Sequence, residues 1–122
     1  MNIYQQQILD NYHNPRNFGA PDRYDHSYKL ENLSCGDEIT IYLQVENNTI
    51  AQAYFDGEGC AISIASASLL TEYLEEKTLD ELRKLQEQDI LEILGIQLTT
   101  SRMRCATLSL EAAQKAVSPE NK

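Results

Sequence analysis

The sequence has few basic side chains, and this deficit excludes one class of partner. Its 122 residues hold 10 Lys and Arg against 19 Asp and Glu, which gives a net charge of −9 at pH 7. A protein that binds nucleic acid through the phosphate backbone needs a basic face, so nonspecific nucleic-acid binding is excluded. The charge instead suits a soluble protein whose partners are basic.

Long hydrophobic runs are also missing. The longest stretch without a charged residue is Gly59–Thr71, and its thirteen residues are too few to cross a bilayer. The first residues show neither the basic nor the apolar segment of a secretory signal. We therefore expect a cytoplasmic protein, and the length and the 42% hydrophobic content indicate one globular domain over residues 1–122.

Cysteine is scarce, with Cys35, Cys60 and Cys105 alone. An odd number of cysteines, in a chain with no visible secretory segment, argues against a disulfide framework. No pair has the C-x-x-C spacing typical of zinc sites, so spacing leaves open that all three are buried as small hydrophobic residues. However, each lies next to a predicted turn or helix start, where a core cysteine has no need to be.

The side-chain pattern predicts an α+β fold. Apolar and polar residues alternate from 38 to 46, as in a half-buried strand, and Asn47-Asn48 suits a tight hairpin into a strand over 49–55. A less regular strand is expected over 24–33. Strands joined by hairpins and followed by helices indicate a small antiparallel sheet of about three strands with helices packed on one face.

The helices are expected to begin and end at recognisable capping residues. They are predicted over residues 2–12, 61–76, 78–86, 89–95 and 102–117. Thr78 and Glu81 have the spacing of a capping box, Asp89 is expected to cap the next helix, and Gly95 to end it.

Two of the cysteines have neighbours that suit metal chemistry. Gly36 lets the backbone turn sharply, so the Cys35 thiol and the Asp37 carboxylate can face one point. Cys60 follows Gly57–Gly59 at a predicted helix start, where free N–H groups and the helix dipole favour the thiolate form.

Arg102 and Arg104 place positive charge near the third thiol, Cys105. They favour its thiolate form, and could steady an anionic persulfide or dock a partner. If the three thiols meet Asp37, they supply the four ligands that tetrahedral zinc takes, and sulfur also suits iron in an iron–sulfur cluster. Because a carboxylate is the harder and weaker ligand, we expect an accessible, exchangeable site rather than a structural one.

Four segments resemble the IscU/SufU family, which includes the NifU N-terminal domain: Asp10–Gly19, Ser34–Asp37, Phe55–Ser68 and Arg102–Leu108. The resemblance implies an α+β fold with a small antiparallel sheet and a role in iron–sulfur cluster assembly. It also implies that sulfur comes from a pyridoxal-phosphate-dependent cysteine desulfurase.

Carried over residue by residue, the resemblance implies that Cys35, Asp37, Cys60 and Cys105 are the ligands. The bound species is then a transient 2Fe–2S cluster or Zn²⁺, and Cys35 and Cys105 are the candidate sulfur acceptors. Family members pass a finished cluster to downstream acceptors or, with zinc bound, relay sulfur to a downstream scaffold.

The subclass is mixed. Arg104 stands where IscU-type proteins have histidine, and a basic residue there resembles the SufU type. Residues 96–100 lack the Leu-Pro-Pro-Val-Lys segment that chaperones recognise in the IscU type, and the 45-residue separation of Cys60 and Cys105 leaves no room for the SufU-type insertion. The interpretation is a SufU-like site on an IscU-length chain. A cluster scaffold is favoured, with a zinc-dependent sulfurtransferase and a structural zinc module as alternatives.

Overall fold

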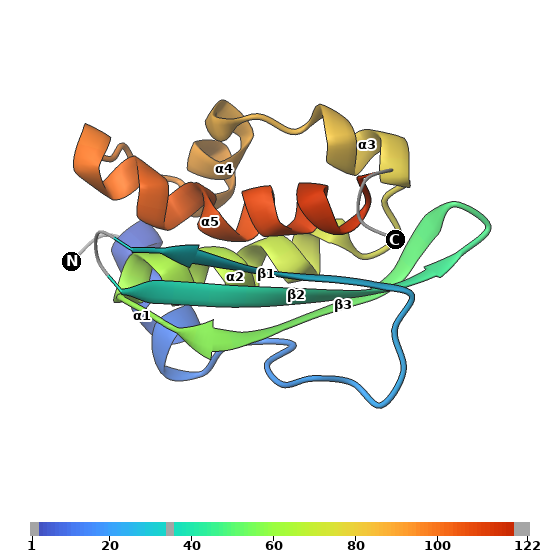
Figure 1. Ribbon diagram of the computed structural model, residues 1–122. Coiled ribbons are helices and arrows are strands. Elements are labelled where there is room, and N and C mark those ends of the chain that lie inside the picture. Colours follow the sequence, from blue (N-terminus) through green and yellow to red (C-terminus); the bar gives the residue numbers. More distant parts are fainter. Residues whose placement is uncertain (1–2, 34–35, 119–122) are drawn as a thin grey trace.

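The structure, a computed structural model, describes residues 3–33 and 36–118, which form an α+β fold of three strands and five helices (Figure 1). The elements are α1 (Ile3–His13), β1 (His26–Asn32), β2 (Asp37–Glu46), β3 (Thr49–Glu58), α2 (Ala61–Leu74), α3 (Leu79–Lys84), α4 (Glu87–Leu94) and α5 (Thr100–Ala116). The strands form one antiparallel sheet in the order β1-β2-β3. None of the helices described is both long and apolar enough to span a bilayer.

The central strand β2 decides which face of the sheet is buried. Ile39, Ile41 and Leu43 are fully buried, whereas Thr40 and Tyr42, which point to the other face, remain partly exposed. Helices α2 and α5 lie over the buried face, while α3 and α4 lie farther out beside α5 (Figure 1). The predicted sheet with helices on one face is therefore confirmed.

Helix α2 packs closely because its side chains are small. All six residues from Ser63 to Ser68 are buried between the sheet, α1 and α5. Leu70 and Leu74 extend the same contact along the helix and are also fully buried. Small side chains let helix and sheet backbones approach one another, so α2 forms the middle of the core.

The β2–β3 hairpin turns where the sequence predicted. Asn47 and Asn48 both have left-handed backbone conformations, with φ of 51° and 64°, as a two-residue hairpin turn requires. Strand β3 is longer than predicted, because its final residues pair with the start of β2 in the register Glu38↔Glu58. This extra pairing holds the end of β3 beside the beginning of β2.

Helix ends confirm one predicted cap and correct another. The Thr78–Glu81 capping box is present at the start of α3. In α4 the predicted Asp89 cap is wrong: Gln86 is the capping residue, and its backbone N–H donates to Asp89 Oδ2 at 2.7 Å from inside the first turn. Gly95 ends α4 in a left-handed conformation, as expected.

The segment after α1 fastens this helix to α2 and covers a sheet edge. The Ser68 hydroxyl donates to Asn11 Oδ1 at 2.6 Å and accepts from the Arg16 N–H at 2.8 Å. The Gly19 N–H donates to the Phe55 carbonyl at 2.7 Å, on the outer edge of β3. Within Asp10–Gly19, these residues therefore have a structural role, and they protect an edge that could otherwise pair with another chain.

Candidate metal centre

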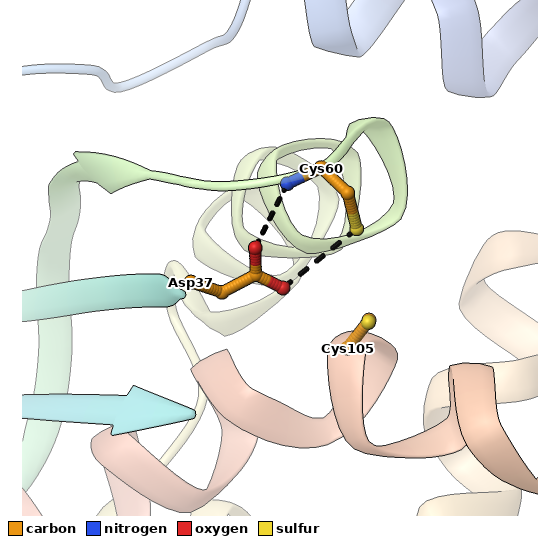
Figure 2. Close-up of side chains that lie close together, drawn as sticks. All are labelled: Asp37, Cys60 and Cys105. Atoms are coloured by element: carbon orange, nitrogen blue, oxygen red, sulfur yellow. Dashed lines mark hydrogen bonds between the residues drawn. The ribbon is translucent and has the colours of Figure 1, made fainter. Parts of the chain in front are cut away.

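Sheet pairing brings Asp37 and Cys60 together from distant parts of the sequence. Asp37 is the first residue of β2, and Cys60 lies two residues after the end of β3 and caps α2. Because the two strands are antiparallel and Glu38 pairs with Glu58, the start of β2 meets the end of β3. The two side chains therefore meet at one end of the sheet (Figure 2).

Helix α5 supplies the third group. It packs on β1, β2 and α2, and Cys105 lies in its second turn. Its sulfur faces Asp37 and Cys60 across the gap between α5 and α2 (Figure 2). The ligand atoms of Asp37, Cys60 and Cys105 all lie within 4.8 Å of one another.

Both oxygens of the Asp37 carboxylate accept hydrogen bonds. The Cys60 backbone N–H donates to Oδ1 at 3.0 Å, and the Ser63 hydroxyl donates to Oδ2 at 2.5 Å. The Cys60 thiol also lies 3.7 Å from Oδ2 (Figure 2). These hydrogen bonds and the N-terminal end of the α2 dipole offset the cost of burying a carboxylate, whose residue is 3% exposed.

Two glycines make this close approach possible. A Cβ at Gly57 would lie 2.1 Å from the Glu38 carbonyl oxygen, and a Cβ at Gly59 would lie 2.9 Å from Asp37 Oδ1. Neither distance is compatible with an ordinary carbon contact. The absence of a side chain at these two positions therefore lets the end of β3 lie against β2 and Asp37.

The centre is more enclosed than the sequence suggested. Cys105 and Asp37 are each 3% exposed, and only Cys60 is half-buried. Cys105 is enclosed because it lies in the body of a 17-residue helix that packs on the sheet, rather than at its first residue. Of the three groups, Cys60 is therefore the most exposed to solvent.

The remaining predicted site residues lie apart from this cluster or outside the description. Cys35 lies outside the described residues. Arg102 and Arg104 are exposed on the first turns of α5, and neither forms an ion pair with any residue in 3–33 or 36–118. Arg104 lines a cavity of about 290 Å³ between the end of β1 and α5, together with Glu31 and Glu111.

Sequence reasoning missed Ser63. Most of the serine and alanine run in α2 is buried in close packing. Ser63, however, lies three residues after Cys60, so the two share one face of the first helical turn, and its hydroxyl bonds to Asp37. The available signal was the spacing: Ser63 lies three residues after Cys60, a candidate ligand at a predicted helix start.

The three groups fit a metal ion. Tetrahedral zinc with bonds of about 2.0–2.3 Å needs ligand atoms roughly 3.3–3.8 Å apart, so small side-chain movements bring atoms within 4.8 Å to one ion. Two thiols and a carboxylate are ligand types that zinc and iron accept. Asp37, Cys60 and Cys105 could therefore hold a metal.

A family model described as the NifU-like N terminal domain matches residues 3–120. The chain belongs to this family. One relative in the NifU-like group is the iron–sulfur cluster assembly scaffold protein IscU 1 of Archaeoglobus fulgidus, which is 35% identical over 94% of this chain and 74% of its own length. Another is the zinc-dependent sulfurtransferase SufU of Bacillus subtilis, which is 31% identical over 97% of this chain and 91% of its own length.

The fold agrees with a solved structure of the same NifU-like kind. The crystal structure of a proposed iron–sulfur cluster assembly scaffold protein for the SUF system, from Fervidobacterium islandicum AW-1, superposes with a TM-score of 0.82. The two chains are 25% identical, and the match covers 93% of this chain and 95% of the other. The resemblance inferred from four sequence segments is therefore confirmed, and the named relatives include both scaffolds and a sulfurtransferase.

Proposed function

We propose that this protein is a scaffold for iron–sulfur cluster assembly. It receives sulfur from a pyridoxal-phosphate-dependent cysteine desulfurase and assembles a transient 2Fe–2S cluster on Cys35, Asp37, Cys60 and Cys105. The cluster is cargo, which the protein passes to downstream acceptors. The observation that carries the proposal is the convergence of Asp37, Cys60 and Cys105 within 4.8 Å at one end of the sheet.

The ligand types suit a site that must load and unload. Thiolates bind iron strongly, whereas a carboxylate oxygen is the harder and weaker partner for a soft site. Cys105 and Asp37 are buried, while Cys60 is half-buried. A site with two buried ligand groups and one that solvent reaches supports a function in which a cluster is loaded and released.

Sulfur delivery uses ordinary thiol exchange. A thiolate of this chain attacks the outer sulfur of the desulfurase persulfide, a new S–S bond forms, and the desulfurase thiolate leaves. Cys35 and Cys105 are the candidate acceptors. Because Cys105 is 3% exposed, α5 has to move relative to its neighbours before that thiol can attack the persulfide.

A zinc-dependent sulfurtransferase is the second candidate function, and Arg104 favours it. This exposed arginine immediately precedes Cys105, and a basic residue at that position resembles the SufU type. In that role the same four groups would hold zinc, which keeps the thiols deprotonated until one of them accepts sulfur. The alignment with the Bacillus subtilis sulfurtransferase spans 135 positions, more than the 122 residues of this chain, so that relative has residues that this chain lacks. The shorter chain favours the scaffold.

Reconstitution separates the two functions. The purified protein is incubated with Fe²⁺, cysteine, a cysteine desulfurase and a thiol reductant, which supplies the electrons that convert sulfane sulfur to sulfide. A scaffold gains iron, acid-labile sulfide and visible charge-transfer bands, and Cys60→Ser loses most of this signal. If the protein keeps only zinc and shows no such bands, the scaffold proposal is wrong.

The relay is tested by turnover. Desulfurase activity is measured with and without the zinc-loaded protein, and acceleration supports sulfur transfer to this chain. The absence of acceleration, together with the absence of a cluster, would leave a structural zinc module as the function of the site.

A further inference from the structure

Ser63 makes a short hydrogen bond in the candidate metal centre, and its hydroxyl is not a ligand type that zinc or iron prefers. Its residue is 1% exposed, and its hydroxyl donates to Asp37 Oδ2 at 2.5 Å. The same oxygen atom of Ser63 lies 3.6 Å from the Cys60 sulfur. Ser63 therefore contacts two of the proposed ligands, Asp37 and Cys60.

Asp37 is held at both ends of its carboxylate. Oδ1 is fixed by the Cys60 backbone N–H, and Oδ2 is fixed by the Ser63 hydroxyl. Two anchors prevent the carboxylate from rotating. A carboxylate oxygen has two lone pairs, so Oδ2 can accept from Ser63 and also face the Cys60 thiol at 3.7 Å, whose proton a bound metal would replace. In Figure 2 this oxygen is the one that points toward the sulfurs.

Other buried serines of α2 show that burial alone does not explain this contact. Ser66 lies one turn further along the helix and is also 1% exposed. Its hydroxyl has no hydrogen-bond partner in the part of the chain that the structure describes. The helix therefore accommodates a buried serine for packing alone. Of the α2 serines, Ser68 bonds to α1 and the segment after it, whereas Ser63 bonds to Asp37.

We propose that Ser63 is a positioning residue, which holds the Asp37 carboxylate with Oδ2 facing the Cys60 and Cys105 sulfurs. This inference rests on the proposed function, because it takes Asp37 as a ligand. Hydrogen bonds that orient ligating side chains in this way typically change metal affinity by roughly 10–100-fold when they are removed. Ser63 thus affects metal affinity by fixing the orientation of the Asp37 carboxylate, the weakest of the proposed ligands.

The test compares zinc affinity in Ser63→Ala with that in the matched control Ser66→Ala. Affinity is measured by competition with a chromophoric chelator, and urea unfolding of the metal-free proteins checks that both variants are folded. We expect a roughly 10–100-fold lower affinity for Ser63→Ala and wild-type affinity for Ser66→Ala. Equal affinity of wild type and Ser63→Ala would overturn the inference and leave the proposed function intact.

A double-mutant cycle shows whether Ser63 acts through Asp37. In an Asp37→Ala background, Ser63→Ala should cause no further loss of affinity, because the group that it positions is gone. A loss of the same size in both backgrounds would overturn the positioning role.

A measurement without metal keeps the inference separate from the proposed function. With one anchor removed, the Asp37 carboxylate holds the Cys60 amide less firmly, so hydrogen exchange of that amide should be faster in Ser63→Ala than in Ser66→Ala. If wild type failed to bind zinc or iron, the proposed function would be wrong even if this exchange difference were found. If the Cys60 amide exchanged at the same rate in both variants, the inference would be wrong.

Discussion

Gly59→Ala should damage the candidate metal centre with little cost to the rest of the fold. The backbone at Gly59 is outside the left-handed region, so alanine is opposed only by its contacts. Its Cβ would lie 2.9 Å from Asp37 Oδ1, 3.0 Å from Asp37 Cγ and 3.1 Å from Ser63 Cβ. The Asp37 carboxylate must therefore move away from the Cys60 N–H.

The magnitude follows from the hydrogen bond that is displaced. The Cys60 N–H donates to Asp37 Oδ1 at 3.0 Å, and a hydrogen bond to a charged group contributes about 1.5–3 kcal/mol. We expect the free energy of unfolding of the metal-free protein to fall by about this amount. Because Asp37 also turns away from the sulfurs, zinc affinity should fall by roughly 10–100-fold.

Chelator competition for zinc and urea unfolding are the assays, with Gly19→Ala as the control. Gly19 has φ of 111° and open space around its Cβ position, so alanine there costs about 1–2 kcal/mol of backbone strain without touching the site. Gly19→Ala should lower stability and leave zinc affinity unchanged. If Gly59→Ala bound zinc as tightly as wild type, the contact between this turn and Asp37 would not matter for the site.

Two further predictions concern the fold. In the capping box at the start of α3, the Glu81 N–H donates to Thr78 Oγ1 at 3.1 Å, and Thr78→Ala removes this hydrogen bond. The free energy of unfolding should fall by about 1 kcal/mol, which a lower thermal midpoint would show. An unchanged midpoint would contradict the prediction. Burial and the hydrogen bond to Asp56 raise the pKa of Tyr42 from 10.0 to about 12. The folded state thus holds this proton more tightly than the unfolded state, so the associated stability is present below pH 10 and is lost as the pH rises toward about 12. The phenolate absorbance of wild type minus that of Tyr42→Phe should therefore have its midpoint near 12, and a midpoint near 10 would show that the contact with Asp56 has no such effect.

Much of the fold could be predicted because its local signals agree with its packing. The alternation in β2, the Asn47-Asn48 turn and the Thr78–Glu81 box each fix a structure by themselves. The predicted Asp89 cap was wrong because an acidic residue suits both the N-cap and the third position of a helix. Only the hydrogen bond from the Gln86 N–H to Asp89 distinguishes the two positions.

The site was predictable as a set of residue types but not as an arrangement. Asp37 and Cys60 meet because β3 continues to Glu58 and pairs with the start of β2, which depends on the sheet register rather than on spacing along the chain. The burial of Cys105 depends on where α5 packs, and the Ser63 hydrogen bond depends on the turn before α2. The sheet register and the packing of α5 have no counterpart in a local sequence pattern, whereas the three-residue spacing of Cys60 and Ser63 does.

The central claim is that Cys35, Asp37, Cys60 and Cys105 together form one metal-binding site. X-ray absorption at the zinc edge of the zinc-loaded protein tests it most directly. The account predicts three sulfur ligands at about 2.3 Å and one oxygen ligand at about 2.0–2.2 Å, with the oxygen signal changed in Asp37→Ala. A zinc environment with fewer than three sulfurs, or one that is unaffected by Cys60→Ser, would contradict it.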